Sequence, residues 1–394
     1  MTIAAPRPRV LFLATEFPTA ASPVVGTFVR EHARAAALHA DVAVLHLERA
    51  PGRHGLFEIA EEGADGGAPT GLRVVRVRYR RFGAPLSYLA FALGAVVAAR
   101  RLARSGFRPD ALHANSFLSA LVGLLLRRIY RVPLVYTEHW SVFLPEDPAT
   151  LSRPMRTIAR LALERANAVL PVSGAMERAL RALAPGARLR VVPNAVDPAL
   201  FHPGPQPPPR AANDPARLLY VGLLYDAKGL DVLLPAVASL LRDGRRVMLD
   251  VVGDGILRGE TEELAARLGL AEGAVTFHGI RPKAEVGERM RGADLLVLSS
   301  RFENNPCVLL EALCCGLPVV ATRVGGVPEI VDAAAGEIAE PGNPEAFAAA
   351  LGRALDRLPA FDRTEIARAA AGRYGHAAVG AALAEIYAGR AGRS

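Results

Sequence analysis

The sequence predicts an α/β protein of two domains, each built on a doubly wound parallel β-sheet. The chain has 394 residues, more than one hydrophobic core of ordinary size accommodates. Its apolar residues form short continuous runs, such as Leu295 to Leu298, separated by helical stretches and by loops with glycine and proline. Such runs are typical of strands buried on both faces of a parallel sheet. A proline-rich segment at 203–215 is poorly suited to a core, so we predict domains at 1–202 and 216–374 with this segment as the linker.

Composition narrows the classes of function. Hydrophobic residues make up 51% of the chain and charged residues 22%, which is typical of a folded globular protein. The formal net charge is +8, a basic balance that suits nucleic acid, an anionic membrane surface or phosphorylated ligands. The sequence has neither a basic platform with aromatic residues nor zinc-finger spacing, so we do not expect nucleic acid as a partner.

Three features indicate a cytoplasmic protein. The first apolar run, Val10 to Ala14, is too short for a signal peptide. The longest apolar stretches, 85–99 and 117–126, fall short of the roughly 20 residues that a bilayer span needs. The three cysteines, Cys307, Cys314 and Cys315, fit neither a disulfide framework nor a zinc site, and we expect small, reduced residues there.

The chain begins with a strand at 9–14, a loop at 15–26 and a helix at 27–40, for which Thr27 is the expected N-cap. Gly26 allows a backbone to approach a ligand closely, and a strand, glycine loop and helix in succession can bind a phosphate. An ordinary turn between strand and helix explains the same residues equally well, and the residues alone leave both interpretations open.

Two apolar helices with arginines follow, predicted at 86–104 and from 117. Before the first of these two helices, residues 50–72 are expected to form a loop or hairpin. Residues 73–80 are expected to form a half-buried strand with arginines on one face. The arginines that follow the apolar stretches of the two helices are Arg100, Arg101, Arg104, Arg127, Arg128 and Arg131. They could contact an anionic membrane surface or a phosphorylated acceptor, or they could simply complement the helix dipoles.

The other strands of the first half are predicted at 41–46, 111–114, 134–137, 168–172 and 190–193. His139 and Trp140 follow the strand at 134–137. Ser173 is the expected cap of the helix after 168–172. A histidine at the end of a strand is often a structural residue, so His139 alone carries little functional weight.

In the second half, strands are predicted at 218–221, 247–252, 275–278, 295–298 and 319–321, and helices from 230 and at 285–291, 307–315, 345–358 and 363–387. Lys228 is one of only two lysines, the other being Lys283, and it lies in a loop beside Gly229. A compact ammonium in such a loop suits a phosphate. The glycines at 253–259 resemble a dinucleotide fingerprint, but the strand at 275–278 does not end in the acidic residue that NAD binding expects.

Two carboxylates stand out in the segment 294–330, which otherwise has few charges. Glu303 lies in the loop after the strand at 295–298, and Glu311 lies on the helix that Pro306 begins and Gly316 ends. Crevices at the carboxyl ends of strands are where open α/β sheets bind ligands. Carboxylates there can accept hydrogen bonds from the hydroxyls of a sugar or ribose, although solvated surface carboxylates have the same spacing.

The string from Glu303 to Thr322 resembles the E-x7-E signature of the retaining nucleotide-sugar glycosyltransferases of family 4, which have the GT-B fold: two Rossmann-like domains that face each other across a cleft. The segment 192–201 is also similar to the family's at the end of the first domain. The resemblance implies a sugar donor near Glu303, donor ribose at Glu311, and donor diphosphate at Lys228. It also implies that the C-terminal helix, about 375–394, crosses back to the first domain.

Further site residues follow from the same resemblance. His139 would face the donor sugar, and with Glu303 and Lys228 it forms the expected catalytic set. With Glu311, the expected donor-binding residues are Gly26, Gly222, Asn304, Asn305 and Pro306. The family usually has an arginine just after the first glycine of the lysine loop, where this chain has Leu223, so one expected cation is missing.

The chain contains no Asp-x-Asp pair, so we expect no metal and no cofactor. Lys228 and helix N-termini would instead stabilise the negative charge of the leaving diphosphate. The leading hypothesis is a cytoplasmic, peripherally membrane-bound glycosyltransferase that moves a sugar to a glycan, lipid-linked or small-molecule acceptor in cell-surface polysaccharide or glycolipid synthesis. The alternatives are a nucleotide-sugar epimerase on the same scaffold and a donor-binding partner subunit without turnover.

Overall fold

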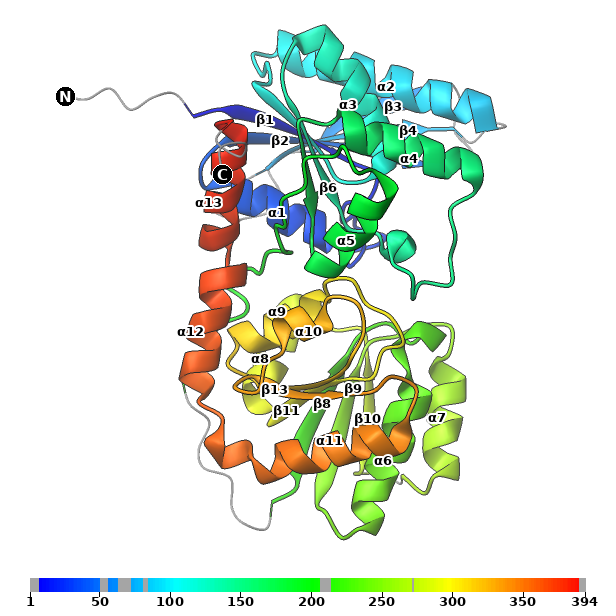
Figure 1. Cartoon of the computed structure of the whole chain (residues 1–394), viewed down its shortest axis with the longest axis vertical. Helices are drawn as coiled ribbons and strands as arrows, with labels where there is room; N and C mark the ends of the chain where they lie inside the picture. Colours follow the sequence, from blue (N-terminus) through cyan, green and yellow to red (C-terminus); the bar gives the residue numbers. More distant parts are fainter. Residues whose placement is uncertain are drawn as a thin grey trace, which may run out of the picture. The chain divides into compact units, whose positions relative to one another are not determined.

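The computed structural model describes residues 7–49, 56–62, 72–80, 84–205, 214–270 and 273–389. The chain divides into two compact units, each described by itself below (Figure 1). Unit 1 comprises Met1–Phe143, Ala149–Ala195 and His376–Ser394; unit 2 comprises Leu144–Pro148 and Val196–Gly375.

The boundary near 202 predicted from the sequence is placed too late. Val196 and Phe201 are buried in the core of unit 2. The Val196 N–H donates to the carbonyl of Tyr374, also in unit 2, at 2.8 Å. The predicted linker at 203–215 falls largely on residues 206–213, outside the described residues.

Unit 1 is built on a seven-stranded sheet with the order β3-β4-β2-β1-β5-β6-β7. All neighbouring strands are parallel except β3 and β4, which form an antiparallel pair, so the sheet is mixed at this edge rather than wholly parallel. The strands are β1 (Arg9–Ala14), β2 (Asp41–Arg49), β3 (Phe57–Glu62), β4 (Arg73–Tyr79), β5 (Ala111–Ala114), β6 (Leu134–Glu138) and β7 (Ala168–Pro171).

Helices cover both faces of this sheet because its strands alternate apolar residues to each side. On β1, Val10 and Phe12 join the core that contains α1 and α13, whereas Leu13 lies next to Gly123 of α3 on the opposite face. The helices of unit 1 are α1 (Thr27–Ala37), α2 (Ala84–Arg104), α3 (Phe117–Tyr130), η1 (Ser141–Phe143), α4 (Arg153–Arg165), α5 (Gly174–Leu183) and α13 (His376–Tyr387).

Unit 2 is built on a six-stranded sheet, parallel throughout, with the order β10-β9-β8-β11-β12-β13. Helix α6 packs with α7 and α11 on one face, and α9 packs with α8 and α12 on the other (Figure 1). The strands are β8 (Ala216–Val221), β9 (Val247–Val252), β10 (Val275–Gly279), β11 (Leu295–Leu298), β12 (Val319–Thr322) and β13 (Gly336–Ala339). The helices are η2 (Asp226–Lys228), α6 (Leu230–Arg242), α7 (Arg258–Arg267), α8 (Lys283–Gly292), α9 (Cys307–Cys314), α10 (Val327–Ile330), α11 (Pro344–Asp356), η3 (Leu358–Ala360) and α12 (Arg363–Tyr374).

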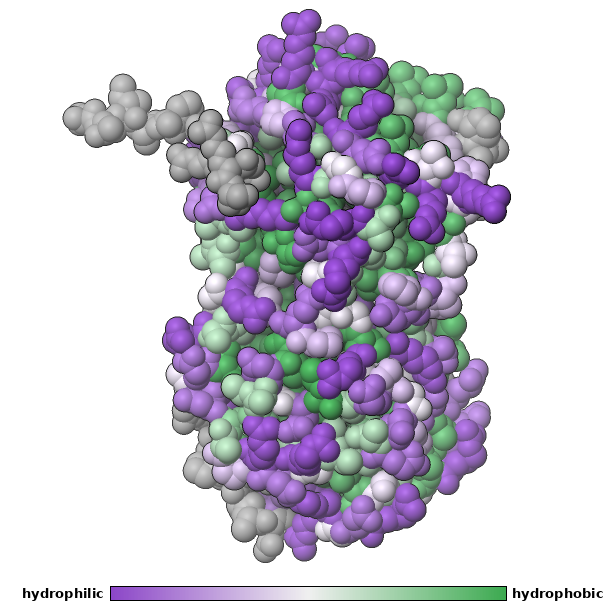
Figure 2. Space-filling view, viewed as in Figure 1, coloured by the Kyte–Doolittle hydropathy of each residue, from purple (hydrophilic) through white to green (hydrophobic). Residues whose placement is uncertain are grey.

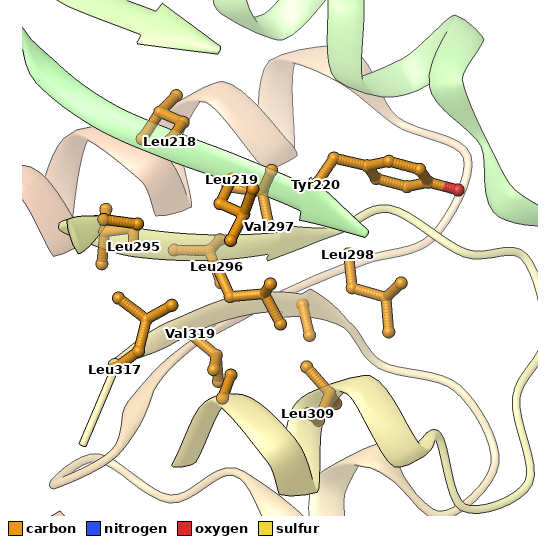
Figure 3. Close-up of a cluster of buried hydrophobic side chains, with 14 of the residues drawn as sticks. Leu218, Leu219, Tyr220, Leu295, Leu296, Val297, Leu298, Leu309, Leu317 and Val319 are labelled. Atoms are coloured by element: carbon orange, nitrogen blue, oxygen red, sulfur yellow. The ribbon is translucent and has the colours of Figure 1, made fainter. Parts of the chain in front are cut away.

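The core of unit 2 lies where its central strands meet α9. Every residue of β11 is buried, as the continuous run of leucines and valine predicts. Side chains of β8 and β12 flank them, and Leu309 of α9 packs onto the same cluster (Figure 3). Gly316, which follows the helix, has φ of 73°, the left-handed conformation expected at this position. This rigid core fixes the loops that leave the carboxyl ends of β8 and β11.

Four local expectations are wrong. Strand β4 is not half-buried: β3 pairs with its outer edge, and Arg76 is buried with hydrogen bonds to His46 and Pro18. Residues 190–193 form no strand but an extended stretch hydrogen-bonded to β7. The predicted helix 363–387 breaks at Gly375, which has an extended conformation, into α12 and α13. The N-cap of α1 is Gly26, and Thr27 is its first helical residue.

Helix α2 departs from the expectation that no apolar stretch could span a bilayer. By length and composition alone, Leu86–Arg104 is long and apolar enough to do so. Ala90, Ala95 and Leu102 of this helix are buried, and it packs against β2, β3 and β4. One face of this helix therefore forms part of the core of unit 1, whereas Leu86 and Leu89 are exposed.

Candidate active site

The candidate site of unit 2 lies at the switch point of its sheet. From β8 the chain proceeds to β9 and β10 on one side, then returns to place β11 on the other side of β8. Open α/β sheets bind ligands at such a switch point, outside the carboxyl ends of the strands. Lys228 follows β8, and Glu303 follows β11. The topology therefore brings these two sequence-predicted residues together.

Backbone contacts hold the two loops against each other. The Ser299 hydroxyl lies 3.0 Å from the Lys228 carbonyl and 2.8 Å from that of Gly229, so it can donate to either. The Arg301 N–H donates to Ala227 at 2.8 Å. Gly229 has φ of 64°, and a Cβ there would lie 2.1 Å from the Ser299 carbonyl oxygen. Only glycine permits this approach, so Lys228 is fixed beside the end of β11.

Lys228 and Glu303 form an ion pair. The Lys228 Nζ donates to Glu303 Oε1 at 2.5 Å, and the Ser300 hydroxyl donates to the same oxygen at 2.8 Å. Glu303 is 9% exposed, whereas the Lys228 side chain keeps 26% of its surface. Burial raises the pKa of the nearby Tyr220 hydroxyl, and the negative charge of Glu303 raises it further. The carboxylate is thus held in one orientation by two donors, and the ammonium remains accessible.

The Glu303 loop is fixed from its other side by the turn after β12. Gly325 has φ of 46°, and a Cβ there would lie 1.6 Å from the Glu303 carbonyl oxygen. The Gly326 N–H donates to the Asn304 carbonyl at 3.0 Å. Asn304 and Asn305, both predicted donor-binding residues, are buried next to Glu303. Pro306 is the N-cap of α9 rather than its first helical residue.

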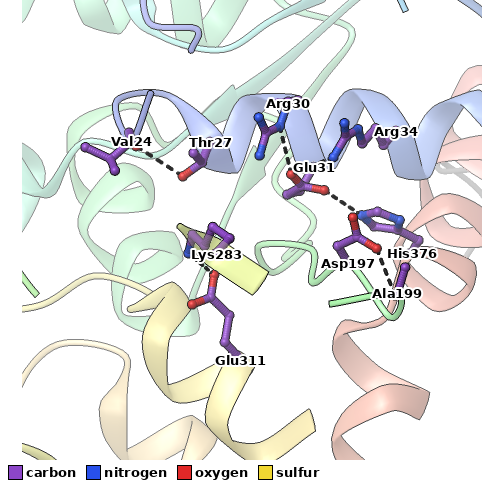
Figure 4. Close-up of polar contacts among 10 residues, drawn as sticks. All are labelled: Val24, Thr27, Arg30, Glu31, Arg34, Asp197, Ala199, Lys283, Glu311 and His376. Atoms are coloured by element: carbon purple, nitrogen blue, oxygen red, sulfur yellow. Dashed lines mark hydrogen bonds and ion pairs between the residues drawn. The ribbon is translucent and has the colours of Figure 1, made fainter. Parts of the chain in front are cut away.

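Glu311 has a partner that the sequence did not predict. The Lys283 ammonium, on the first residue of α8, donates to Glu311 Oε1 (Figure 4). The same ammonium lies 5.4 Å from the centre of the Phe201 ring. Glu311 is 7% exposed. The only two lysines of the chain thus pair with the two glutamates of the E-x7-E string; the rarity of lysine was a signal that could have found Lys283.

Two glycines bring the loops after β8 and β9 together beside the loop that contains Lys228. Gly222 follows β8, and a Cβ there would lie 2.9 Å from the Tyr220 hydroxyl. Gly253 follows β9 with φ of 140°, and a Cβ there would lie 1.8 Å from the Gly222 carbonyl oxygen. The loops after β8 and β9 are therefore in backbone contact. Leu223, in place of an arginine, is 38% exposed beside them.

Gly26 and His139 belong to unit 1. Gly26 is at φ 71°, and a Cβ there would lie 2.5 Å from the backbone between Glu16 and Phe17, so its immediate role is to fold the loop after β1 onto itself. His139 follows β6; its Nδ1 lies 3.1 Å from the Asn194 side-chain oxygen, and its Nε2 lies 3.4 Å from that of Asn115. Both residues lie at the carboxyl edge of the sheet of unit 1.

His139 is a neutral imidazole in this setting. Burial lowers its pKa well below the usual value, and the neighbouring His32 lowers it further. The two rings lie 5.2 Å apart, and Phe28 lies against His139 at 4.5 Å. Both ring nitrogens already lie near amide oxygens, so a hydrogen bond between the ring and a ligand hydroxyl requires the loss of one of these contacts. As a neutral ring, it does not supply a positive charge.

Comparison with known proteins identifies the chain. Residues 215–357 match the family model of group 1 glycosyl transferases, and residues 25–200 match that of glycosyltransferase family 4. A D-inositol 3-phosphate glycosyltransferase from Segniliparus rotundus is 32% identical over 305 residues, which are 72% of this chain and 67% of the relative. The chain belongs to glycosyltransferase family 4. A D-inositol 3-phosphate glycosyltransferase from Streptomyces griseus is 33% identical over 72% of this chain and 68% of the relative.

Solved structures agree with this assignment at the level of the fold. A sucrose-phosphate synthase from Thermosynechococcus elongatus superposes with a TM-score of 0.74, covering 98% of this chain and 99% of its own, at 21% identity. HepE from Anabaena, in complex with UDP-glucose, gives a TM-score of 0.70 at 22% identity, covering 97% and 99%. With its two α/β units, this family 4 glycosyltransferase has the GT-B fold that the sequence predicts.

The buried carboxyl of Glu138, beside His139, makes the stability of this family 4 enzyme depend on pH. Glu138 is fully buried, accepts from the Tyr136 hydroxyl, and accepts from the Trp140 N–H at 2.9 Å. Burial raises its pKa from 4.5 to about 7. Because the folded chain binds this proton more tightly than the unfolded chain, the contribution of Glu138 to stability is present below pH 4.5 and is lost as the pH rises through about 7.

We expect Glu138→Gln to remove this contribution. The free energy of unfolding of the variant, relative to the parent, should rise by about 2 kcal/mol between pH values of about 5 and 8, since one pKa unit corresponds to about 1.4 kcal/mol. Chemical denaturation at both pH values measures it. The His32 imidazole, whose pKa burial lowers to about 4, acts in the opposite direction but is present in both chains and cancels. Parallel pH profiles for the two chains would contradict the assignment.

Proposed function

We propose that the enzyme transfers a hexosyl group from a nucleoside-diphosphate sugar to an alcohol acceptor with retention of anomeric configuration. The observation that carries the proposal is the pair of lysine–glutamate contacts at and beside the switch point: Lys228 with Glu303, and Lys283 with Glu311. An ammonium suits a diphosphate, and carboxylates suit the hydroxyls of sugar and ribose. The fold neighbour HepE, which was solved with UDP-glucose, supports the choice of donor.

In the proposed reaction an acceptor hydroxyl oxygen forms a bond to the anomeric carbon on the face that the diphosphate leaves. The bond between the anomeric carbon and the diphosphate oxygen breaks, and the diphosphate keeps the electron pair and takes up the acceptor proton. Glu303 holds the sugar and stabilises the positive charge that develops on it, whereas Lys228 stabilises the charge of the leaving diphosphate. His139, as a neutral imidazole, would hydrogen-bond a hydroxyl of the donor sugar.

We propose that this chemistry needs no metal ion, because a protein cation is already placed where the leaving group would be. Among the described residues no group of three or more histidine, cysteine, aspartate or glutamate side chains is arranged to hold a metal ion. We expect the initial rate of transfer to be unchanged by an excess of EDTA and not to rise on addition of Mg²⁺ or Mn²⁺. Loss of activity in EDTA that returns with either ion would contradict this expectation.

A panel of nucleotide sugars tests the donor. Thermal unfolding with each donor should single out one nucleotide sugar, because a ligand at about 100 times its Kd stabilises the folded chain by about 2.7 kcal/mol. That donor is then incubated with glycan, lipid-linked and small-molecule acceptors. D-inositol 3-phosphate should be among the acceptors, since it appears in the names of the curated relatives.

The products separate the proposal from its alternatives. A new glycoside together with free nucleoside diphosphate supports transfer, and the anomeric coupling constant in its NMR spectrum reports retention. An isomerised donor without acceptor would identify an epimerase instead. Stabilisation by a donor without turnover on any acceptor, and without slow donor hydrolysis, would identify a binding subunit. We place the reaction in the cytoplasm, in cell-surface polysaccharide or glycolipid synthesis.

A further inference from the structure

An apolar groove runs along α3 in unit 1, outside the candidate active site. One part, of about 250 Å³, lies between α2, α3 and α4 and is lined by apolar side chains such as Phe91, Val122 and Ile158. A second part, of about 590 Å³, continues between α3 and α4 and shares Leu121 and Leu125 with the first. Arginines line only this second part, so the groove has an apolar end and a basic end.

Large apolar side chains stand exposed around the groove. On α2, Leu86 is 52% exposed and Leu89 61%; on α3 and α4, Leu125 and Leu161 are each 42% exposed. In Figure 2, hydrophobic residues gather over α2 at the upper right of the molecule, with hydrophilic residues beside them. Contiguous exposed apolar surface with a polar rim is typical of a site for a protein or membrane partner.

The charge of the chain is concentrated on the same three helices. Helices α2 and α3 contain five arginines and no acidic residue; α4 contains four arginines and one acid, Glu164, which pairs with Arg160 at 2.8 Å. Nine arginines against one glutamate give a net charge of +8, which equals the formal net charge of the whole chain. Outside these helices the charges balance, so the excess positive charge of the chain lies on the three helices that form the groove, and Arg127, Arg128 and Arg165 line the groove itself.

We propose that the α2–α3–α4 surface binds an anionic phospholipid bilayer. Exposed leucines can enter the boundary between headgroups and acyl chains while arginines contact anionic headgroups, and the two contributions together give stable but reversible attachment. A second copy of this chain does not fit, because a two-fold contact through this face would bring two basic surfaces together. A small soluble anion would use the arginines but would leave the exposed leucines in water.

Sedimentation of the 394-residue chain with vesicles tests the proposal. We expect binding to vesicles of phosphatidylcholine mixed with phosphatidylglycerol, and little binding to phosphatidylcholine alone. Arg128 and Arg165, both exposed at the basic end of the groove, are replaced together by glutamine. At about 1 kcal/mol per arginine, this should lower the partition coefficient about 30-fold. The control is Arg267→Gln with Arg368→Gln, exposed arginines of unit 2 whose removal changes the net charge equally.

A second pair of variants tests the apolar contribution. Leu125→Ser with Leu161→Ser should lower binding to the mixed vesicles at least about tenfold, since burying a leucine side chain contributes about 1.5–3 kcal/mol. Ile256→Ser with Ile280→Ser, exposed in unit 2, should leave it unchanged. Equal losses in test and control variants, or binding that ignores the lipid charge, would overturn the proposal. The proposal would also be overturned if the parent chain bound no vesicles and formed a dimer that the leucine substitutions dissociate. Vesicle binding is measured without donor, so its outcome is independent of transferase activity.

Discussion

Replacement of Glu303 by glutamine is expected to lower the rate of sugar transfer by about 10²–10³-fold, the loss typical of removing one group that stabilises transition-state charge. Glutamine has the shape of glutamate and can still accept a hydrogen bond from the Ser300 hydroxyl, so the loop should keep its course. It carries no charge, however, and can neither balance the Lys228 ammonium nor stabilise positive charge on the sugar. The main effect should therefore fall on kcat rather than on the affinity for the donor.

Steady-state kinetics with the donor found by thermal unfolding measure this effect, and the donor affinity is measured separately. Glu263→Gln is the matched control, because its side chain lies in the same unit and is 75% exposed on α7. The control should keep the rate of the parent enzyme. A Glu303→Gln enzyme with a near-normal kcat would show that the carboxylate has no part in the reaction, whatever its effect on binding.

The pairing of Glu303 with Lys228 could be anticipated from sequence because it follows from topology. Buried apolar runs predicted β8 and β11, and polar residues after each run predicted loops at the same edge of a parallel sheet. The string from Glu303 to Glu311 also resembles a glycosyltransferase signature. This resemblance suggested roles for residues that the strand pattern had already placed at one edge of the sheet. Local pattern and overall fold agree here, which is why the two side chains lie at one edge of the sheet as the sequence predicts.

The contact between Lys283 and Glu311 could not be anticipated in the same way. It depends on how α8 packs against α9, and no local pattern encodes the relative placement of two helices. Arg76 shows the same limit: its alternation predicted an exposed face, but the side chain is buried with hydrogen bonds to His46 of β2 and to Pro18 in the loop after β1. Likewise the break at Gly375 is set by the backbone bridge between Gly375 and Val196, residues far apart in sequence.

Lys228 and Lys283 should have different roles in donor binding, and the affinities of two ligands can distinguish these roles. One is the nucleoside diphosphate of the preferred donor, and the other is the corresponding nucleoside, which lacks phosphates. Lys228→Ala should weaken the diphosphate about 10–100-fold, the value of a hydrogen bond to a charged group, and leave the nucleoside unchanged. Lys283→Ala should weaken both ligands by the same factor of about ten, because it removes the cation that pairs with the buried Glu311 carboxylate, the group that we propose binds the ribose hydroxyls.

Isothermal titration of the two ligands into each variant decides between these roles. Lys228→Arg and Lys283→Arg keep the charge and serve as rescue variants; a guanidinium at either position should restore only part of the affinity. If Lys283→Ala weakened the diphosphate alone, the ammonium would be a second phosphate ligand that takes the place of the arginine missing at Leu223. If Lys228→Ala weakened both ligands equally, its pairing with Glu303 would be structural, and the diphosphate would have to bind elsewhere at the edge of the sheet.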